Sequence, residues 1–513
     1  MTTGAEALVK TLADCGVEAC FANPGTSEMH LVTALDREPR IRSILCLFEG
    51  VASGAADGYA RIAGKPAMTL LHLGSGLTNA SANLHNARRA RSPVVNVIGD
   101  HATYHLQYDA PLTSDIAGLA RPNAVWLGRV ESAAVAGARA AEAWSASQHG
   151  AGGPVALLLP ADSAWTEGAE SAPRAKASGL VAPDKGVVAE VAARLKAAKK
   201  PVLLINGSAT VEPGLSAAGR IEAAGVKIIT DTFIWRQARG AGRFAPQRLA
   251  YFGEMALAEL EGVDLMVLVG TQPPAAFFAY PGKPGLLVPE GCETAVLASP
   301  DQDAGAALAL LADALGAPAA GPVAARQDFP APKGVLSPAD VGVSIARHMA
   351  AGAIIADDGV TAGLPVFSMT AGAEPHDWLA LTGGAIGIGM PLAVGAAVAA
   401  PDRKVICLSG DGAGMYTNQA LWTMAREKLD VLTIVFANRS YRILNIEMAR
   451  TGAGNPGPAA TSMLSLDNPP VDWVKLAEAQ GVTAARCETA EAFDTMCARM
   501  LAMKGPSLIE AAC

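Results

Sequence analysis

The sequence is poor in charged and aromatic residues. Charged residues make up 17% of the 513 positions and aromatic residues 5%, whereas hydrophobic residues make up 51%. So few charges in so apolar a chain argue against long disordered segments, which combine high charge with low hydrophobicity. Basic residues are outnumbered by acidic ones, 40 against 48, and the net charge is −8. A general nucleic-acid-binding surface, which needs clustered positive charge, is therefore not expected.

A regular cysteine pattern is also absent. The eight cysteines are scattered, none forms a CxxC pair, and several lie in apolar runs such as SILCLF at 43–48. A thiol in such a run packs as a small hydrophobic group, which favours a reduced, cytoplasmic compartment. The N-terminal stretch 1–16 has an amphipathic helical pattern and lacks the charged-then-apolar order of a secretory signal.

No stretch is a convincing membrane span. Residues 381–400 have about the 20-residue length that a span requires. Five glycines and Pro391 interrupt this stretch, and it leads directly into the charged turn PDRK. We therefore expect it to lie inside a folded domain and not in a bilayer.

Short apolar runs alternate with helical patterns along most of the chain. At about 150 residues per domain, the length suggests roughly three domains. Strand, turn and helix repeated in this order are typical of βαβ units with a parallel sheet covered on both faces. Two stretches rich in Pro, Ala and Gly interrupt the rhythm, at 167–184 and 316–338. We predict an α/β protein with domains at 1–166, 185–316 and 338–513.

The most informative local pattern lies in the third of these domains. One buried strand is expected to end at Gly410-Asp411-Gly412 and the next at Asn438. Ligands of open α/β sheets bind outside the carboxyl ends of the strands, where both polar side chains would converge. A carboxylate and an amide oxygen suit Mg²⁺ or Ca²⁺, and Mg²⁺ takes its other ligands from phosphate and water. A helix expected to begin near Thr417 could direct N–H groups at such a phosphate.

This pattern resembles the diphosphate-anchoring motif of thiamine-diphosphate enzymes. GDG alone would indicate only a turn with a capping Asp, and the Asn after the next strand is what carries the resemblance. The family often shows Asn-Asn, where this chain has Ala437-Asn438. The resemblance implies a metal held by Asp411, Asn438 and the backbone carbonyl of Ser440. It also implies cofactor contacts from Gly410, Gly412, Ala413, Asn438, Ser440 and Tyr441.

A second element of the resemblance lies far upstream. The run SILCLF ends at Glu49, which opens a helix rich in small residues. Enzymes of this class place a Glu at this strand end, where it pairs with N1′ of the aminopyrimidine and promotes formation of the C2 ylid. Taken alone, Glu49 would be a helix-start carboxylate facing the macrodipole. Together with the GDG motif, it is expected to bind the cofactor and take part in catalysis.

Longer segments resemble benzoylformate decarboxylases and acetolactate synthase large subunits. This likeness implies three doubly wound parallel-sheet domains, a pyrimidine-binding, a middle and a diphosphate-binding one, and an enzyme that acts on 2-oxo acids. The segments that carry it are FANPGTSE (21–28), LFEGVASGAADGYAR (47–61), LLHLGSGLTNASANLHNA (70–87) and GGAIGIGMPLAVGAA (383–397).

The resemblance suggests further site residues, each with a simpler alternative. Ile386, beside Gly384, matches the apolar residue that holds the cofactor bent, or it is ordinary sheet core. His72 matches an active-site histidine of benzoylformate decarboxylases that could relay protons near neutral pH, or it is a structural histidine. Thr26 matches a serine that contacts the substrate carboxylate, or it is a helix N-cap.

The sequence departs from the known subgroups at three positions. Phe278 stands nearest to the second catalytic histidine of benzoylformate decarboxylases. Leu444 stands where pyruvate decarboxylases carry an acid, and Glu447 stands where acetolactate synthases usually carry Trp. If this segment is helical, Leu444 and Glu447 share a face. Glu447 is then either a site acid or a solvated surface residue.

The predicted function is that of a 2-oxo acid decarboxylase and carboligase, a lyase or transferase similar to acetolactate synthase. The resemblance implies a C2 ylid and an enamine, which is protonated to an aldehyde or attacks a second carbonyl to give an acyloin. The alternatives are a benzoylformate-decarboxylase-type enzyme, an acyl-CoA lyase of the same family, and a non-catalytic cofactor-binding paralogue.

The cofactors implied are thiamine diphosphate and Mg²⁺. FAD is possible but unsupported, since Gln272 stands where flavin-binding relatives place a basic residue. The partners implied are a small 2-oxo acid and further copies of the chain, with no nucleic acid and no membrane. In a homodimer or homotetramer of this family, Glu49 of one chain faces the diphosphate site of another.

Overall fold

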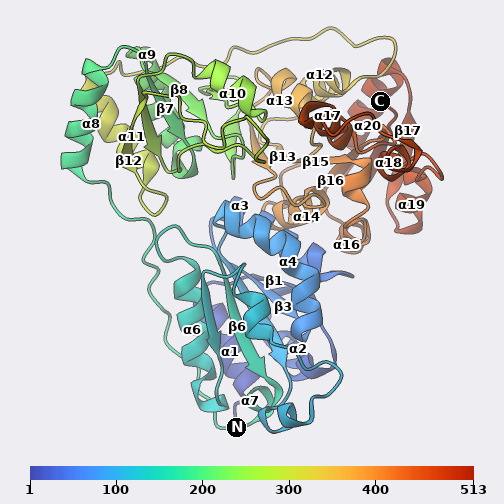
Figure 1. Ribbon diagram of the computed structural model, residues 1–513. Helices are drawn as coiled ribbons and strands as arrows, with labels where there is room; N and C mark the ends of the chain where they lie inside the picture. Colours follow the sequence, from blue (N-terminus) through green and yellow to red (C-terminus); the bar gives the residue numbers. More distant parts are fainter.

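The computed structural model describes all residues, Met1 to Cys513. Figure 1 shows three α/β units, the N-terminal one below, the middle one at upper left and the C-terminal one at upper right. They are built on sheets of six, five and seven strands, and all but one of the strand pairings are parallel. This architecture confirms the predicted α/β class with three mainly parallel sheets.

The N-terminal unit has the strand order β2-β1-β3-β4-β6-β5. Its strands are β1 (Ala19–Asn23), β2 (Arg42–Leu45), β3 (Ala67–Leu71), β4 (Val94–Asp100), β5 (Trp126–Arg129) and β6 (Pro154–Pro160). Its helices are α1 (Gly4–Asp14), η1 (Thr26–Glu28), α2 (Met29–Asp36), α3 (Glu49–Ala63), α4 (Leu73–Ala90), η2 (Thr103–Tyr108), α5 (Ile116–Ala120), η3 (Ala133–Val135), α6 (Ala136–Ser147) and α7 (Ala161–Trp165). The central strands β3, β4 and β6 are buried along their whole length, because helices cover both faces of the sheet.

The middle unit has the strand order β10-β8-β7-β11-β12. Its elements are α8 (Lys185–Ala197), β7 (Pro201–Ile205), η4 (Gly207–Thr210), α9 (Gly214–Ala223), β8 (Lys227–Thr230), β10 (Gln247–Arg248), α10 (Gly253–Glu259), β11 (Leu265–Val269), β12 (Glu293–Ala298) and α11 (Ala304–Leu315). The chain between α7 and α8 contains neither helix nor strand, which agrees with the Pro- and Ala-rich composition there.

The C-terminal unit has the strand order β17-β18-β16-β15-β13-β14-β9. Its strands are β9 (Gln237–Arg239), β13 (Ile354–Asp358), β14 (His376–Ala380), β15 (Val405–Gly410), β16 (Val431–Phe436), β17 (Thr483–Cys487) and β18 (Ser507–Ala511). Its helices are α12 (Pro338–His348), α13 (Gly363–Met369), α14 (Gly389–Ala399), α15 (Asp411–Gly414), α16 (Ala420–Arg426), α17 (Arg442–Thr451), α18 (Pro458–Leu464), α19 (Trp473–Ala479) and α20 (Ala490–Ala502). Strand β9 comes from the chain between β8 and β10 and pairs antiparallel with β14, so the middle segment contributes an edge strand that the sequence pattern did not predict.

Helices α3 and α14 join the N-terminal and C-terminal units at close range. A Cβ atom on Gly58 of α3 would lie 2.1 Å from the carbonyl oxygen of Leu392, and one on Gly395 of α14 would lie 1.8 Å from that of Ala55. Only glycine permits this approach of two backbones. The apolar stretch 381–400 is therefore explained by α14, which is buried almost entirely between the two sheets. No helix in the chain combines the length and the apolar character that crossing a bilayer requires.

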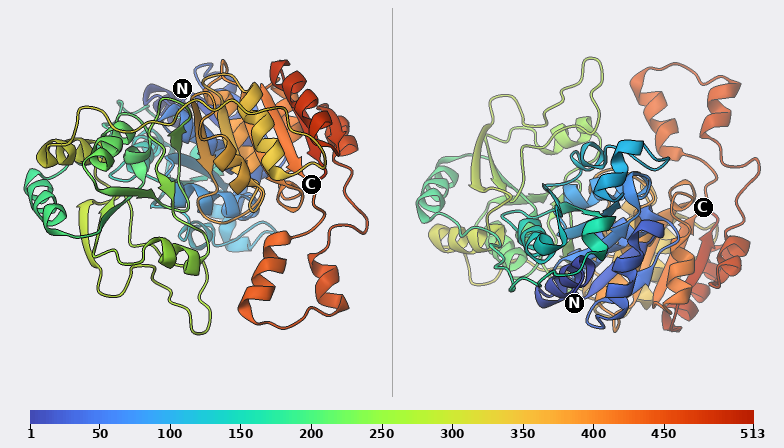
Figure 2. Two further views of the ribbon diagram at one scale, coloured as in Figure 1. Left: turned by 90° about the horizontal axis from the view of Figure 1, so that it is seen from above. Right: turned by 90° about the horizontal axis from the view of Figure 1, so that it is seen from below.

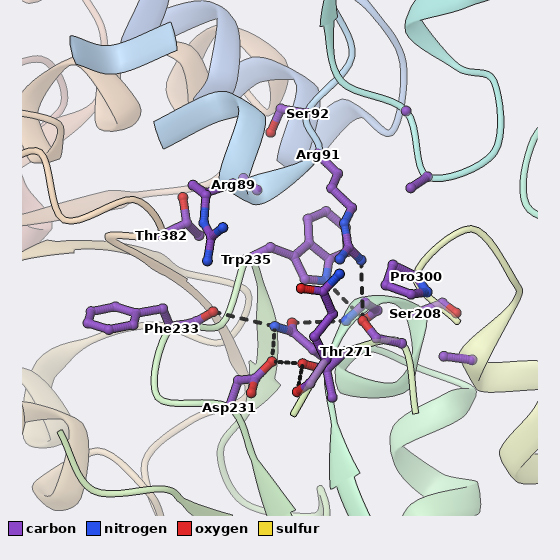
Figure 3. A pocket seen from close by; sticks show the side chains of 18 of the residues that line it. Arg89, Arg91, Ser92, Ser208, Asp231, Phe233, Trp235, Thr271, Pro300 and Thr382 are labelled. Atoms are coloured by element: carbon purple, nitrogen blue, oxygen red, sulfur yellow. Dashed lines mark hydrogen bonds between the residues drawn. The ribbon is translucent and has the colours of Figure 1, made fainter. Parts of the chain in front are cut away.

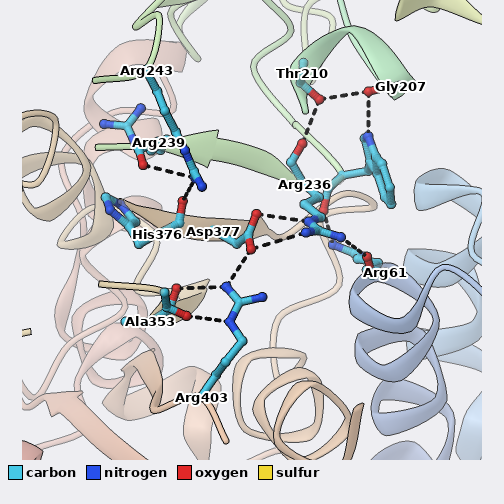
Figure 4. A network of polar contacts seen from close by, with 12 residues as sticks. Arg61, Gly207, Thr210, Arg236, Arg239, Arg243, Ala353, His376, Asp377 and Arg403 are labelled. Atoms are coloured by element: carbon cyan, nitrogen blue, oxygen red, sulfur yellow. Dashed lines mark hydrogen bonds and ion pairs between the residues drawn. The ribbon is translucent and has the colours of Figure 1, made fainter. Parts of the chain in front are cut away.

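Arg61 links all three units from the C-terminal end of α3. Its side chain is fully buried and pairs at 2.5 Å with the equally buried Asp57 one turn earlier. The guanidinium also donates to the carbonyl oxygen of Ala380 at 2.8 Å and to that of Trp235 at 3.1 Å, which belong to the C-terminal sheet and the middle segment. Figure 4 shows that Arg236 in turn donates to the carbonyl oxygen of Arg61 at 3.0 Å.

Asp377 forms the other half of the network in Figure 4. The buried carboxylate on β14 accepts hydrogen bonds from Arg236 at 3.1 Å and from Arg403 at 2.6 Å. Arg236 comes from the middle segment directly before β9, and Arg403 comes from the turn after α14. Although Asp377 is buried, the nearby guanidinium groups of Arg236 and Arg403 hold its pKa below the ordinary value. The units are therefore joined by satisfied buried charges as well as by apolar packing.

Substitution of Arg61 tests this junction. In Arg61→Ala, the carboxylate of Asp57 loses its buried cation and two carbonyl oxygens lose their donor. Removing one partner of a buried pair typically costs about 3–5 kcal/mol, so we expect a clearly lower thermal unfolding midpoint. Lys65→Ala is the matched control, because Lys65 pairs with Glu18 at the exposed surface and should leave the midpoint nearly unchanged. Equal midpoints for the two variants would contradict the assignment.

Candidate active site

Two neighbouring strand ends of the C-terminal sheet bring together Asp411 and the turn 438–440. Asp411 follows β15 and is the first residue of α15, and its Oδ1 accepts the N–H of Gly412 at 2.8 Å. Its Oδ2 accepts the N–H of Arg439 at 2.6 Å, just beyond β16. The Oδ1 atom of Asn438 accepts the N–H of Ser440 at 2.9 Å. The expected metal ligands therefore share one edge of the sheet, as the parallel topology requires.

The donor set at this edge suits a magnesium ion bound to a diphosphate. Burial raises the pKa of Asp411, because a charged carboxylate is less stable away from water. An adjacent divalent cation would offset this loss of solvation. No group of three or more His, Cys, Asp or Glu side chains is placed to hold a metal anywhere in the chain. A metal at Asp411 would thus have one carboxylate, amide and carbonyl oxygens, and ligands from phosphate and water, which is typical of Mg²⁺.

Glycine at 412 is required by the neighbouring ring of Tyr441. A Cβ atom at this position would lie 2.5 Å from that ring. The helix expected to begin near Thr417 is α16, which begins at Ala420, and the single turn α15 begins at Asp411 itself. The sequence pattern missed α15 because a single turn containing two glycines has little helical propensity. The helical N–H groups next to the GDG motif therefore belong to α15, residues 411–414, and not to a helix that begins at Thr417.

The loop that carries Gly384 and Ile386 is held by Asp358 at the end of β13. Oδ2 of Asp358 accepts the N–H groups of Gly387 at 2.8 Å and Gly389 at 3.2 Å. Ile386 is half-buried, whereas Ile388 is fully buried in the core. Ile386 lies in the loop before α14 and in no strand, so the sheet-core alternative for Ile386 was wrong.

Gly384 and Gly387 both adopt left-handed backbone conformations in this loop. Gly384 has φ +79° and Gly387 has φ +92°. A Cβ atom on Gly384 would lie 2.3 Å from the ring of Phe277, and one on Gly387 would lie 2.5 Å from Cβ of Tyr416. Each position therefore needs glycine for conformation and for space.

In the N-terminal sheet, Glu49 and His72 follow two strands that flank β1. Glu49 is the first residue of α3, 6% exposed, and its Oε2 accepts a hydrogen bond from the amide of Asn79 at 2.9 Å. His72 is the N-cap of α4, and its Nδ1 lies 2.8 Å from Oε2 of Glu28. Because an ionised carboxylate only accepts, Nδ1 of His72 is the donor in this pair, and Nε2 is left for other partners.

Glu28 is a site residue that the sequence interpretation did not single out. It is 3% exposed and also accepts the N–H of Gly25 at 2.8 Å and the hydroxyl of Ser27. Its position two residues after Thr26 in NPGTSE is the sequence feature that could have identified Glu28 as a candidate. Thr26 itself is exposed and is the first residue of η1, with Gly25 as the N-cap. The N-cap alternative for Thr26 was therefore wrong.

Leu444 and Glu447 lie on α17, so the segment is helical, which is the condition under which the two residues would share a face. Leu444 is 46% exposed. The side chain of Glu447 is only 13% exposed and is bonded to Tyr280 and Arg450. Glu447 is therefore not a freely solvated surface residue. No hydrogen bond or ion pair joins it to Asp411 or Asn438.

Strained backbone conformations recur at three of these strand ends. Leu73, Val360 and Arg439 have φ of +48°, +48° and +55° and follow β3, β13 and β16 closely. A positive φ is costly for residues with a Cβ and most of all for the β-branched Val360, at about 1–3 kcal/mol each. Such strain persists where surrounding contacts impose it, and it is concentrated at functional sites.

A large cavity lies elsewhere, between the N-terminal and middle units. It has a volume of about 750 Å³, and Figure 3 shows Arg89 and Arg91 on one side with Asp231 and Thr271 on the other. Burial raises the pKa of Asp231, which accepts a hydrogen bond from Asn206 at 2.8 Å. Gln272 also lines this cavity. By contrast, the cavity beside Asp411 measures about 60 Å³, far below the 300–1,000 Å³ of a typical cofactor pocket.

Comparison with known protein families identifies both ends of the chain. Residues 2–119 match the model of the thiamine pyrophosphate enzyme N-terminal TPP-binding domain. Residues 365–511 match that of the C-terminal TPP-binding domain of the same family. The first match includes Glu49 and His72, and the second includes Asp411 and Asn438.

Curated relatives align with nearly the whole chain. A Mycobacterium tuberculosis protein, provisionally named acetolactate synthase large subunit IlvX, is 52% identical over 99% of this chain and 98% of its own. Benzoylformate decarboxylase of Pseudomonas aeruginosa is 28% identical over 99% and 98%. The acetolactate synthase isozyme 1 large subunit of Escherichia coli is 27% identical over 86% and 83%.

Solved structures share the fold. The thiamine diphosphate-dependent 4-hydroxybenzoylformate decarboxylase of Rhodococcus jostii RHA1 superposes with a TM-score of 0.85 at 24% identity, covering 100% of this chain and 99% of its own. Benzoylformate decarboxylase from Polynucleobacter necessarius gives a TM-score of 0.85 at 22% identity with the same coverage.

The buried carboxyl of Asp358 predicts a pH-dependent stability. Burial, with a smaller effect of Asp357, raises its pKa from 3.8 to about 7, and Cys407 is the other titratable group close to it. The folded state therefore favours the neutral acid, and charging it costs free energy as the pH rises from the unfolded value towards 7. In Asp358→Asn, which cannot ionise, this cost is absent.

We expect the stability of the wild type relative to Asp358→Asn to fall by about 2–3 kcal/mol between roughly pH 5 and pH 8. Thermal unfolding of both proteins across that range measures the difference. The amide oxygen can still accept the N–H groups of Gly387 and Gly389, so the loop should keep its conformation. A difference that stays constant with pH would refute a carboxyl of raised pKa at this position.

Proposed function

The chain belongs to the thiamine pyrophosphate enzyme family, and from that membership we propose that it is a Mg²⁺-dependent 2-oxo acid decarboxylase and carboligase similar to acetolactate synthase. The observation that carries the proposal is the meeting of Asp411 with the turn 438–440, together with Glu49 at a strand end of the other TPP-binding domain. The relative with 52% identity supports the acetolactate-synthase-like assignment.

We assign the cofactor contacts to the residues at the strand ends of the C-terminal sheet. Thiamine diphosphate, when bound, supplies the electron sink that allows a 2-oxo acid to lose CO₂. Asp411, Asn438 and the carbonyl of Ser440 would hold its metal. Further contacts would come from Gly384, Ile386, Gly410, Gly412, Ala413 and Tyr441.

Two side chains of the N-terminal unit are suited to handling protons. One oxygen of Glu49 is oriented by Asn79, and the other is left to hold a proton shared with the aminopyrimidine N1′. Nδ1 of His72 is anchored on Glu28, which leaves Nε2 to give or take a proton near the substrate. The exposed hydroxyl of Thr26 lies on the strand end next to both.

A benzoylformate-decarboxylase-type reaction is the second candidate, and His72 favours it. Nε2 of His72, with the ring anchored on Glu28, could deliver a proton at the carbon that has lost CO₂, which would favour an aldehyde product over attack on a second carbonyl. Phe278, 53% exposed, offers no proton at the place of the second histidine of those enzymes. Analysis of the products, aldehyde or acyloin, therefore distinguishes the two candidate reactions.

We propose that the active enzyme is a homodimer or homotetramer with sites between chains. Within one chain, the hydrogen bond of Glu49 goes to Asn79, and the cavity beside Asp411 has only about 60 Å³. Large apolar residues are exposed near both Glu49 and Asp411. Leu47, close to Glu49, is 47% exposed, and Met415 and Tyr416, close to Asp411, are 43% and 54% exposed. A second copy covering them would complete the site. All eight cysteines are free thiols, which supports a cytoplasmic location.

A substrate panel tests the reaction. Protein reconstituted with thiamine diphosphate and Mg²⁺ receives pyruvate, 2-oxobutyrate, benzoylformate or oxalyl-CoA, and CO₂, aldehyde and acyloin are all measured. We expect CO₂ and acyloin from a simple 2-oxo acid. Aldehyde alone would favour the benzoylformate-decarboxylase type, and turnover of oxalyl-CoA alone would favour an acyl-CoA lyase. No turnover at all would favour a non-catalytic paralogue and refute the proposal.

Glu49→Gln isolates the proton-transfer role. The amide keeps the size of the side chain but cannot hold the shared proton, so we expect kcat to fall by about 10²- to 10⁴-fold. The thermal midpoint should stay close to that of the wild type. Glu18→Gln is the control, because Glu18 is an exposed partner of Lys65. Full activity of Glu49→Gln would remove Glu49 from the mechanism.

FAD is not part of the proposed reaction, although the 750 Å³ cavity has room for a large ligand. Gln272 offers no charge to a flavin, and Arg89 and Arg91 would have to bind its phosphates instead. We expect the purified protein to lack the visible absorption of a flavin and added FAD to leave its activity unchanged. Stoichiometric flavin released on denaturation would contradict this expectation.

A further inference from the structure

Helix α17 is joined to the body of the protein by few contacts. Neither α17 nor α18 has a buried residue. Both views in Figure 2 show this pair of orange-red helices standing away from the sheets. A helix without a buried apolar face gains little from hydrophobic packing, so polar contacts must define its position.

The start of α17 is continuous with the predicted metal-binding turn. Tyr441, its N-cap, directly follows Ser440, and the amide of Asn445 donates to the hydroxyl of Ser440 at 2.9 Å. Because a helix is a stiff element, a rotation of its far end changes the direction of the turn at its near end. The position of α17 is therefore coupled to the carbonyl that we assign to the metal.

The far end of α17 is bound to the middle unit by one polar cluster. The hydroxyl of Tyr280 donates to Oε2 of Glu447 at 2.7 Å, and Nη1 of Arg450 donates to Oε1 at 3.1 Å. Nη2 of Arg450 pairs with Glu254, which also pairs with Lys283. The guanidinium of Arg450 lies 3.9 Å from the ring centre of Phe252. We call Tyr280, Glu447, Arg450 and Glu254 the docking cluster.

The docking cluster is more than a single surface ion pair. Glu447 and Glu254 both pair with Arg450, and Glu254 also pairs with Lys283 beside the cluster, so no charge is left unpaired, and the aromatic face of Phe252 adds a cation–π contact. The side chains of Glu447 and Arg450 are 13% and 23% exposed, which limits screening by salt. Contact with the carboxylate of Glu447 raises the pKa of Tyr280, so its hydroxyl remains a donor at neutral pH.

The same middle-unit segment contacts a second part of the site. Phe277, three residues before Tyr280, lies against Gly384 of the loop that carries Ile386. Its ring is packed between Phe233 at 5.4 Å, Tyr251 at 5.5 Å and Phe278 at 4.8 Å. Residues 277–280 thus meet both the Ile386 loop and α17 of the C-terminal unit.

We propose that the docking cluster holds α17 against the middle unit and that Glu447 is a positioning residue for the metal-binding turn and not a proton donor. Both carboxylate oxygens of Glu447 already accept hydrogen bonds from protein donors, so neither presents a proton to a substrate. Its effect on the reaction would pass through α17 to Ser440. The mechanical part of this inference, the docking of α17, rests on the contacts alone. The catalytic part, the effect of Glu447 on the metal-binding turn, rests on the proposed function.

Three variants remove different members of the cluster. Tyr280→Phe deletes one hydrogen bond and keeps the ring, Glu254→Gln deletes the anion shared by Arg450 and Lys283, and Glu447→Gln keeps an acceptor of the same shape. Tyr280 and Glu254 lie on the middle unit, away from the assigned cofactor contacts. Glu293→Gln is the matched control, since it breaks an exposed pair with Arg194 in the same unit.

The mechanical part is measured by limited trypsin digestion of the holoenzyme. Cleavage after Arg450 or Arg442 requires α17 to leave its docked position and unwind. We expect each cluster variant to be cut several-fold faster at these residues than the wild type, and Glu293→Gln to be cut at the wild-type rate. Unchanged cleavage in all three variants would overturn the docking role, whatever reaction the enzyme catalyses.

The catalytic part is measured by the Mg²⁺ activation constant, kcat and the pH profile. We expect the three variants to raise the Mg²⁺ activation constant several-fold in parallel and to keep the shape of the pH profile of kcat. The double variant Tyr280→Phe/Glu447→Gln should raise the Mg²⁺ activation constant no further than the more affected of the two single variants, because both substitutions remove one contact.

The opposite outcome would make Glu447 a proton donor and overturn the proposal. In that case Glu447→Gln alone would turn over more slowly by about two orders of magnitude or more, the loss expected when a general acid is removed. One limb of its pH profile would also be missing, and its cleavage by trypsin would match that of the wild type.

Discussion

The buried pair of Arg61 and Asp57 is the constraint on which the relative position of the three units depends. Two fully buried charges are tolerated only if each is paired and hydrogen-bonded. Arg61 meets this requirement with carbonyl oxygens of Ala380 and Trp235, which come from two other parts of the chain. The units must therefore be docked for the charge to be satisfied. The close packing of α3 on α14 then orients the helix that begins with Glu49 relative to the C-terminal sheet.

Parallel topology explains why the chemistry gathers where it does. Glu49, Glu28 and His72 follow the adjacent strands β2, β1 and β3. In the C-terminal sheet, Asp358 ends β13, and Asp411 and Asn438 follow the neighbouring strands β15 and β16. The carboxyl ends of parallel strands share one edge, so residues distant in sequence become neighbours without long loops. The strained residues Leu73, Val360 and Arg439 lie at the same edges, where the chain must turn sharply after a buried strand.

Much of the candidate site was predictable from local sequence. Asp411 and Asn438 each follow an apolar run whose length and composition are those of a buried strand, and Glu49 stands at a similar boundary. Glu28 and Asp358 were missed, because a lone acid after an apolar run is equally typical of a helix cap or a turn. Their roles depend on partners far away in sequence, His72 for Glu28 and the N–H groups of Gly387 and Gly389 for Asp358.

The sequence by itself determined the α/β class, the cofactor family and the positions of Glu49, Asp411 and Asn438. These features are encoded within a single strand and the turn that follows it, and such a unit carries its own pattern. Only the tertiary structure decided that β9 joins the C-terminal sheet, that Glu28 anchors His72, and that Glu447 is bonded to Tyr280 and Arg450. Those outcomes depend on which distant polar groups are buried together, and the free energy of a buried polar group is set by the partner it finds there.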